Sequence, residues 1–166
     1  MVSINHLHVF LRAECHLSPQ AEDVEQVRKN VLKLVKDVNM QVFMEPRVKY
    51  MPDIGNEGLT WVVGLETSHS SFHAWDKPDN NLMKYKDSTL LQMDMYTCGP
   101  LCESEIKVLL QFIEEYQPKL LSLNMYDRSK HDSMESPIVK IRYDEACGSS
   151  YKDFVDSLKI VYNEEK

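Results

Sequence analysis

Residues 59–75, LTWVVGLETSHSSFHAW, decide the fold of this chain, because they form two strand-like segments on either side of Glu66-Thr67. The first segment is rich in aromatic and β-branched residues, which favour strands. The second, from Ser68 to Trp75, alternates polar and apolar positions, which is typical of a strand with one buried face. Both segments therefore indicate a sheet.

The same criteria predict five further strands and three helices along the chain. The predicted strands are 4–13, 40–50, 90–97, 119–125 and 138–143, and the predicted helices are 19–38, 102–116 and 151–162. Pro46 lacks a backbone N–H, so the strand over 40–50 should lie at a sheet edge or carry a bulge. Since strands outnumber helices, we expect an α+β two-layer sandwich, with an antiparallel-rich sheet and helices packed on one face.

Composition limits the class of protein. The 166 residues, 43% of them hydrophobic, suffice for one core, so we expect a single domain over 1–166. A net charge of −7, with no Lys/Arg cluster along the sequence, argues against a nucleic-acid partner. A cationic or zwitterionic small molecule would suit the average surface field better.

The cysteines and the amino terminus indicate a reducing compartment. The four cysteines lack the dense spacing of a secreted disulfide scaffold, so we expect free thiols. Polar residues interrupt the first apolar stretch, which argues against a signal peptide, and no later run is long enough to span a bilayer. We therefore expect a cytoplasmic protein with no membrane partner.

Two motifs carry the functional signal. Thr67-Ser68-His69-Ser70-Ser71-Phe72-His73-Ala74-Trp75 gathers histidines and serines on one strand, and Met93-Asp94-Met95-Tyr96-Thr97-Cys98-Gly99 follows downstream. Without other information, the first would be as consistent with half-buried sheet as with a site. Together they resemble the paired signature of the S-adenosylmethionine decarboxylase family of the short prokaryotic type. Measured against that family, the chain has a loop insertion at about 76–89 and a C-terminal extension at about 127–166.

The resemblance implies a pyruvoyl-dependent decarboxylase that makes its own cofactor. Ser68 would attack the preceding carbonyl, cut the chain at Thr67-Ser68 and become the pyruvoyl group. His73 would remove the Cα proton during this processing, and Cys98 would protonate the decarboxylated product. A regular strand places residues five apart on opposite faces, so the role of His73 requires a bend or reversal at Thr67-Ser68.

The resemblance also implies a substrate site, a substrate and a partner. Tyr50 lies where an aromatic ring stacks on adenine, and Thr60 lies where a serine hydroxyl assists the site. Asp76 is the carboxylate in the corner where the family's Pro-Glu holds the ribose hydroxyls, so it is a candidate substrate-binding residue. The implied substrate is S-adenosylmethionine, decarboxylated for polyamine (spermidine) biosynthesis, and the implied assembly is a homodimer. The chain departs from the family in having Thr67 in place of glutamate and Asp76-Lys77 in place of Pro-Glu.

Three alternatives stay open. Related pyruvoyl enzymes of this fold act on ornithine or arginine, and the altered corner around Asp76 is compatible with such a substrate. A homologue that does not process itself could serve as a binding or regulatory subunit. A zinc site could combine His6 and His8, His69 and His73, and Cys98 and Cys102, but this spacing is unlike that of zinc knuckles, so we expect no metal.

Overall fold

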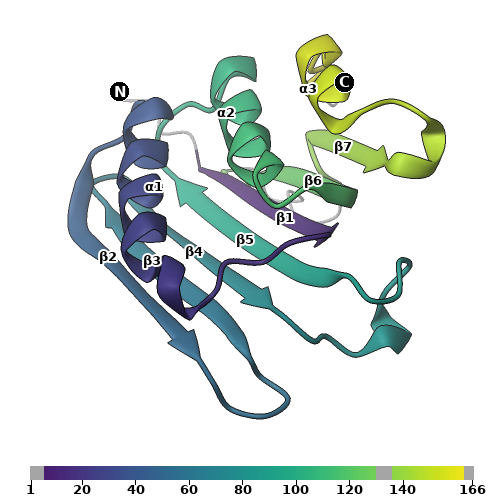
Figure 1. Ribbon diagram of the computed structural model, residues 1–166. Coiled ribbons are helices and arrows are strands. Elements are labelled where there is room, and N and C mark those ends of the chain that lie inside the picture. Colours follow the sequence, from purple (N-terminus) through teal and green to yellow (C-terminus); the bar gives the residue numbers. More distant parts are fainter. Residues whose placement is uncertain (1–5, 130–135, 163–166) are drawn as a thin grey trace, which may run out of the picture.

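A computed structural model describes residues 6–129 and 136–162. It contains a seven-stranded antiparallel sheet in the order β2-β3-β4-β5-β1-β6-β7, with three helices on one face (Figure 1). The strands are β1 (Leu7–Cys15), β2 (Val42–Met51), β3 (Gly58–Leu65), β4 (Ser68–Trp75), β5 (Thr89–Thr97), β6 (Pro118–Asp127) and β7 (Val139–Asp144). The predicted α+β class is therefore confirmed.

The predicted strands agree with the observed ones to within three residues at each end. The predicted start of the first strand, at residues 4–5, lies outside the described residues, as do parts of the C-terminal extension. β2 lies at the sheet edge, and its pairing with β3 shifts register between Met44 and Arg47, on either side of Pro46. Both expectations for this strand are confirmed, because Pro46 cannot donate to a ladder.

The helices are shorter than predicted. They are α1 (Val24–Asp37), α2 (Glu103–Glu114) and α3 (Tyr151–Ser157). α1 begins five residues after Pro19, because residues Ala21–Asp23 form a 3-10 turn in which the Asp23 carboxylate accepts the Gln20 N–H at 2.8 Å. α3 ends at Ser157, where the next residue has extended backbone.

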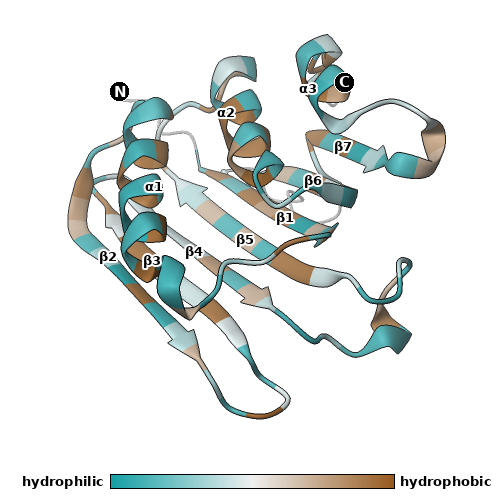
Figure 2. Cartoon of the chain, in the orientation of Figure 1, coloured by the Kyte–Doolittle hydropathy of each residue, from teal (hydrophilic) through white to brown (hydrophobic). Residues whose placement is uncertain are grey.

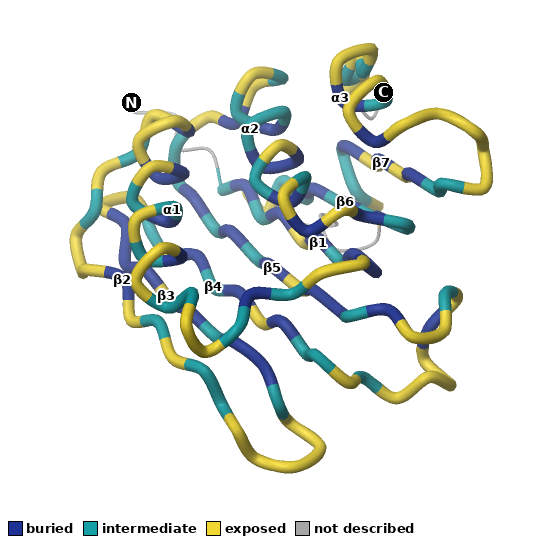
Figure 3. The backbone as a smooth tube through the Cα atoms, viewed as in Figure 1, coloured by how far each residue is buried: buried dark blue, intermediate teal, exposed yellow. Residues whose placement is uncertain are grey.

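The core lies between the sheet and the helices. Burial alternates along the strands: most odd-numbered residues of β1, β3 and β5 are buried, and in β4 the buried residues are Ser70, Phe72 and Ala74 (Figure 3). Each helix contributes an apolar stripe to this layer, and the hydropathy colouring shows brown facing the sheet and teal facing solvent (Figure 2). None of α1, α2 and α3 covers the opposite face of the sheet, which we call the open face.

The inserted segment between β4 and β5 is fastened to the sheet. The carboxylate of Glu14 on β1, which is 1% exposed, accepts the backbone N–H groups of Lys84 and Tyr85 at 3.1 and 2.8 Å. Arg12 donates to the same carboxylate at 2.9 Å. The segment between β4 and β5 is thus bonded to β1 through Glu14.

The four cysteines are free thiols, as expected. Within residues 6–129 and 136–162, the longest apolar helix falls short of what is needed to cross a membrane.

Candidate functional site

The first group of predicted site residues lies at the turn between β3 and β4. Ser68 is the first residue of β4 and pairs with Thr97, the last residue of β5. The N–H of Cys98 donates to the carbonyl oxygen of Thr67 at 3.1 Å. The peptide bond predicted to be cut therefore lies beside the backbone of the predicted proton donor, and its carbonyl is polarised by that N–H.

Thr67 is held in the same turn by its side chain. Its hydroxyl lies 3.3 Å from the hydroxyl of Thr97, which in turn accepts the N–H of Gly99 at 2.9 Å. These contacts join the residue before Ser68 to the Thr97-Cys98-Gly99 segment. The two sequence motifs thus meet at one end of the sheet.

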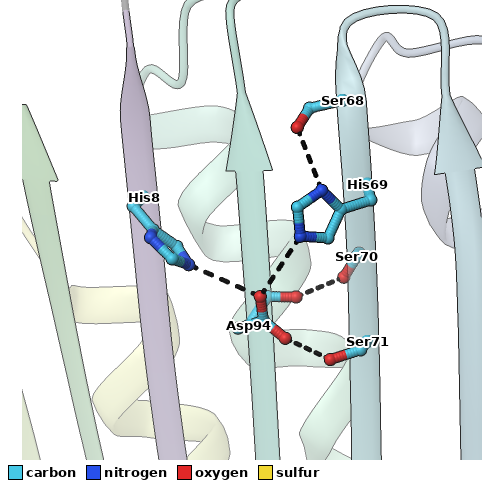
Figure 4. Close-up of polar contacts among 6 residues, drawn as sticks. All are labelled: His8, Ser68, His69, Ser70, Ser71 and Asp94. Carbon is cyan, nitrogen blue, oxygen red and sulfur yellow. Dashed lines mark hydrogen bonds and ion pairs between the residues drawn. The ribbon is translucent and has the colours of Figure 1, made fainter. Parts of the chain in front are cut away.

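A histidine adjoins the Ser68 hydroxyl. Ser68 Oγ lies 3.2 Å from His69 Nδ1, and His69 Nε2 lies 3.9 Å from Asp94 Oδ2 on β5. Figure 4 shows the three side chains in a line across β4 and β5. This serine, imidazole and carboxylate series was not predicted from the sequence, although both motifs contain its members.

Asp94 is fixed from several sides. Ser71 donates to Asp94 Oδ1, His8 Nε2 lies 3.4 Å from Asp94 Oδ2, and Ser70 donates to the Asp94 carbonyl at 2.6 Å (Figure 4). Its carboxylate therefore has a defined orientation on the open face. A polar residue between Met93 and Met95 was the available sequence signal, but alternation alone does not distinguish a functional carboxylate from a solvated one.

His8 is neutral in this arrangement. Burial lowers its pKa from the ordinary value, and the hydrogen bond to Asp94 only partly opposes the effect. Its Nδ1 is buried and has no hydrogen-bond partner. A protonated ring would place an unsatisfied N–H at that position, so the neutral ring, which donates from Nε2 to Asp94, fits the surroundings.

His73 forms a second group, away from Ser68. Its Nδ1 lies 2.7 Å from Thr60 Oγ1, and its ring stacks on Trp75 with 5.3 Å between centroids. β4 pairs regularly with β5 from Ser68 opposite Thr97 to His73 opposite Gln92. At about 3.3 Å per residue, five residues of strand separate Ser68 from His73 by roughly 16 Å.

The reversal that the His73 role requires falls at Glu66-Thr67, before β4 begins. It therefore turns β3 into β4 without folding His73 back onto Ser68. Within one chain, the structure brings Thr60 to His73 and Thr67 to Cys98, but it does not bring the two groups together.

Tyr50 and Asp76 form a third group. The Tyr50 hydroxyl donates to Asp76 Oδ2 at 2.6 Å, and Ser18 donates to Asp76 Oδ1. The hydrogen bond to the carboxylate, with its charge, raises the pKa of Tyr50 to about 12. Both carboxylate oxygens of Asp76 therefore already have partners within the chain.

A hollow of about 650 Å³ lies beside the second group. Thr60, His73 and Trp75 line it, together with Arg28, Arg47 and Lys49. Arg47 and Lys49 come from β2 and Arg28 comes from α1, so the fold gathers three cations around one hollow on a chain of net charge −7. This grouping is not visible along the sequence, because α1 and β2 come together only in the fold.

Metal ligation finds no support in the part of the chain that the structure describes. No three of its histidine, cysteine, aspartate or glutamate side chains are grouped as a metal ion requires. The three residue pairs considered for zinc therefore do not converge into one site there.

Comparisons with known proteins agree with the motifs. Residues 11–129 match the family model described as S-adenosylmethionine decarboxylase. The crystal structure of the adenosylmethionine decarboxylase from Aquifex aeolicus superposes with a TM-score of 0.52 at 20% identity, covering 76% of this chain and 92% of that one. A phage SAM lyase in complex with S-methyl-5'-thioadenosine is similar at a TM-score of 0.38 and 6% identity, covering 87% and 93% of the two chains. No curated protein sequence matches.

Proposed function

This chain belongs to the S-adenosylmethionine decarboxylase family, and from that membership we propose that it cuts itself between Thr67 and Ser68 and then decarboxylates S-adenosylmethionine. Ser68 supplies the pyruvoyl group, and Cys98 returns a proton to the product. The product is the aminopropyl donor of polyamine synthesis. The protein acts in the cytoplasm.

The turn between β3 and β4 is the observation that carries this proposal. A hydroxyl, a carbonyl and a thiol-bearing residue must share one place for cleavage and later protonation, and residues 67, 68 and 98 share it. The Thr67 carbonyl accepts the Cys98 N–H at 3.1 Å, and this donor would stabilise negative charge on the carbonyl oxygen during attack.

The residues at this turn fit a pyruvoyl group formed in place. When present, such a group withdraws electrons from the substrate carbon that loses carbon dioxide. Ser68 is half-buried at a strand end beside Thr97 and Cys98, so the new amino terminus would stay next to the predicted proton donor. Cys98 is only partly exposed, which suits a proton donor sheltered from bulk water.

A homodimer would complete the site. His73 and Thr60 lie on the open face and are too far along β4 to serve Ser68 of the same chain. That face is not covered by α1, α2 or α3, and it exposes Phe10 and Val62. A second copy packed there can bring its own His73 and Thr60 to Ser68 and cover the apolar side chains.

Self-cleavage is tested by intact mass. The wild-type chain should yield fragments of residues 1–67 and 68–166, because Ser68 attacks its neighbour. Ser68→Ala should remain whole, and Ser157→Ala, which removes an exposed hydroxyl at the end of α3, should be cut like the wild type. A single wild-type chain that persists after long incubation would contradict the enzyme and favour the binding or regulatory subunit.

The substrate is tested separately. Both carboxylate oxygens of Asp76 accept hydrogen bonds from Ser18 and Tyr50, so they are not free to bind ribose hydroxyls. Ornithine and arginine have no ribose, and they are therefore the second candidate substrates. Purified processed protein is offered carboxyl-labelled S-adenosylmethionine, ornithine and arginine in turn, and released carbon dioxide is measured. Release from S-adenosylmethionine alone supports the proposal, whereas release from either amino acid alone replaces the substrate.

A further inference from the structure

We propose that His69 is the general base that takes the hydroxyl proton of Ser68 in the first step of self-cleavage, and that Asp94 is the positioning residue that orients His69. The inference rests on the proposed function and adds to it a base distinct from His73. It is carried by the line of Ser68, His69 and Asp94 across β4 and β5 (Figure 4).

The two nitrogens of His69 face different groups. Nδ1 lies 3.2 Å from Ser68 Oγ, and Nε2 lies 3.9 Å from Asp94 Oδ2. The Asp94 carboxylate beside Nε2 favours the His69 tautomer that carries its proton on Nε2. In this tautomer, Nδ1 has a free lone pair directed at the Ser68 hydroxyl. The same logic orders a serine, a histidine and a carboxylate in hydrolases, although here the serine and histidine are neighbours in sequence.

Two further side chains hold the Asp94 carboxylate in place. The other imidazole in contact with it is His8, which burial keeps neutral, so His8 donates a hydrogen bond without cancelling the carboxylate charge. Ser71 holds the second carboxylate oxygen. These contacts fix the direction in which Asp94 presents its charge to the more exposed His69.

The step is balanced within the chain. The hydroxyl proton of Ser68 passes to His69 Nδ1 as Oγ bonds to the carbonyl carbon of Thr67. The bond from that carbon to the Ser68 nitrogen then breaks, and His69 returns the proton to the leaving amine. The result is an ester between Thr67 and the Ser68 side chain, with a free amine on Ser68.

This assignment gives the two proton transfers of self-cleavage to two different histidines. His69 handles the hydroxyl proton, whereas the Cα proton removed later, when the ester is eliminated, falls to His73. His69 adjoins Ser68 within one chain, so the ester can form before any partner supplies His73. Chains without His69 should therefore fail earlier than chains without His73.

The experiment follows full-length chains by intact mass, with and without hydroxylamine, which cleaves esters and spares amides. His69→Ala should slow cleavage by roughly 100-fold or more and show no hydroxylamine-sensitive ester. His73→Ala should accumulate that ester, and His16→Ala, which alters an exposed histidine beyond the end of β1, should match the wild type. Asp94→Asn should slow ester formation, with thermal unfolding recorded to check its fold.

A second readout does not need cleavage. In ¹⁵N-histidine-labelled Ser68→Ala, the His69 ring should carry its proton on Nε2, and Asp94→Asn should shift the tautomer balance. If wild type is cut and His69→Ala is cut equally fast, the inference is overturned while the proposed function stands. If the wild type forms an ester that His69→Ala lacks but is never cut, only the proposed function fails. If the wild type stays whole and forms no hydroxylamine-sensitive ester, the proposed function and the inference fail together. A His69 ring with its proton on Nδ1 would also overturn the inference.

Discussion

Asp76 is a candidate substrate-binding residue that already has two partners within the chain. The resemblance places it in the corner that holds ribose hydroxyls, and in the structure its two oxygens accept the hydroxyls of Ser18 and Tyr50. Tyr50 and Asp76, which are both candidate substrate-binding residues, thus form a hydrogen bond with each other. A substrate that uses either residue must displace this hydrogen bond or exploit the position that it gives the tyrosine ring.

Asp76→Asn should lower the pKa of Tyr50 from about 12 towards the ordinary value of about 10, because the charge that favours the protonated phenol is removed. Because the pKa of Tyr50 is higher in the folded than in the unfolded chain, this tyrosine adds to the free energy of unfolding below about pH 10, and the contribution is lost as the pH rises towards 12. In Asp76→Asn, the free energy of unfolding should lose this dependence on alkaline pH. The measurement is an absorbance titration, with Tyr50→Phe identifying the transition. Ser18→Ala keeps the charge and should shift it less. An unchanged Tyr50 titration in Asp76→Asn would refute the contact.

The segment between β4 and β5 shows the same effect at the scale of an element. Its polar composition predicts a loop, but the buried Glu14 on β1 holds it through two backbone N–H groups. Burial alone would raise the pKa of Glu14, and the hydrogen bonds from Tyr85, Lys84 and Arg12 outweigh it and keep the pKa below its ordinary value. The carboxylate is therefore charged and acts as an anchor.

Glu14→Ala should reduce the free energy of unfolding by roughly 2–3 kcal/mol, since it leaves three donors without their acceptor. Chemical denaturation gives this value, and hydrogen exchange should show faster exchange at Lys84 and Tyr85. Glu45→Ala, at an exposed position on the edge strand, is the matched control and should change stability little. Equal exchange in both variants would show that Glu14 does not anchor the segment.

At the scale of the whole molecule, the predicted site is divided. Ser68 and Cys98 lie at one end of β4, and His73 with Thr60 lies towards the other. The open face that carries His73 also carries His69 and Asp94, and His69 Nδ1 reaches the Ser68 hydroxyl at the end of β4. A homodimer through this face would allow the two ends of β4 to meet across the interface.

A mixture of two variants tests this division. In the homodimer, the His73→Ala chain retains Ser68 and can borrow His73 from a Ser68→Ala partner, so co-expression should restore its cleavage to fragments. Each variant alone should give no completed cleavage. Light scattering should show dimers in all cases. Failure of the mixture to restore cleavage, with mixed dimers present, would assign His73 to its own chain or to no role.

The sequence by itself determined the strands and favoured an edge position or a bulge for β2, because these depend on local alternation and proline chemistry. It also proposed Ser68 and Cys98 as site residues through the resemblance of the two motifs. It placed helix starts less well, because a side chain such as Asp23 can stabilise a 3-10 turn ahead of α1.

Only the tertiary structure decided which candidates are neighbours. Strand register separates Ser68 from His73 and aligns His69 with Asp94, and helix packing gathers Arg28, Arg47 and Lys49 around one hollow. Register and packing depend on contacts between residues far apart in the chain, which no local pattern encodes. For that reason the sequence could propose Ser68 as the reacting residue, whereas the contact of Ser68 with His69 and the approach of His69 to Asp94 became visible only in the folded sheet.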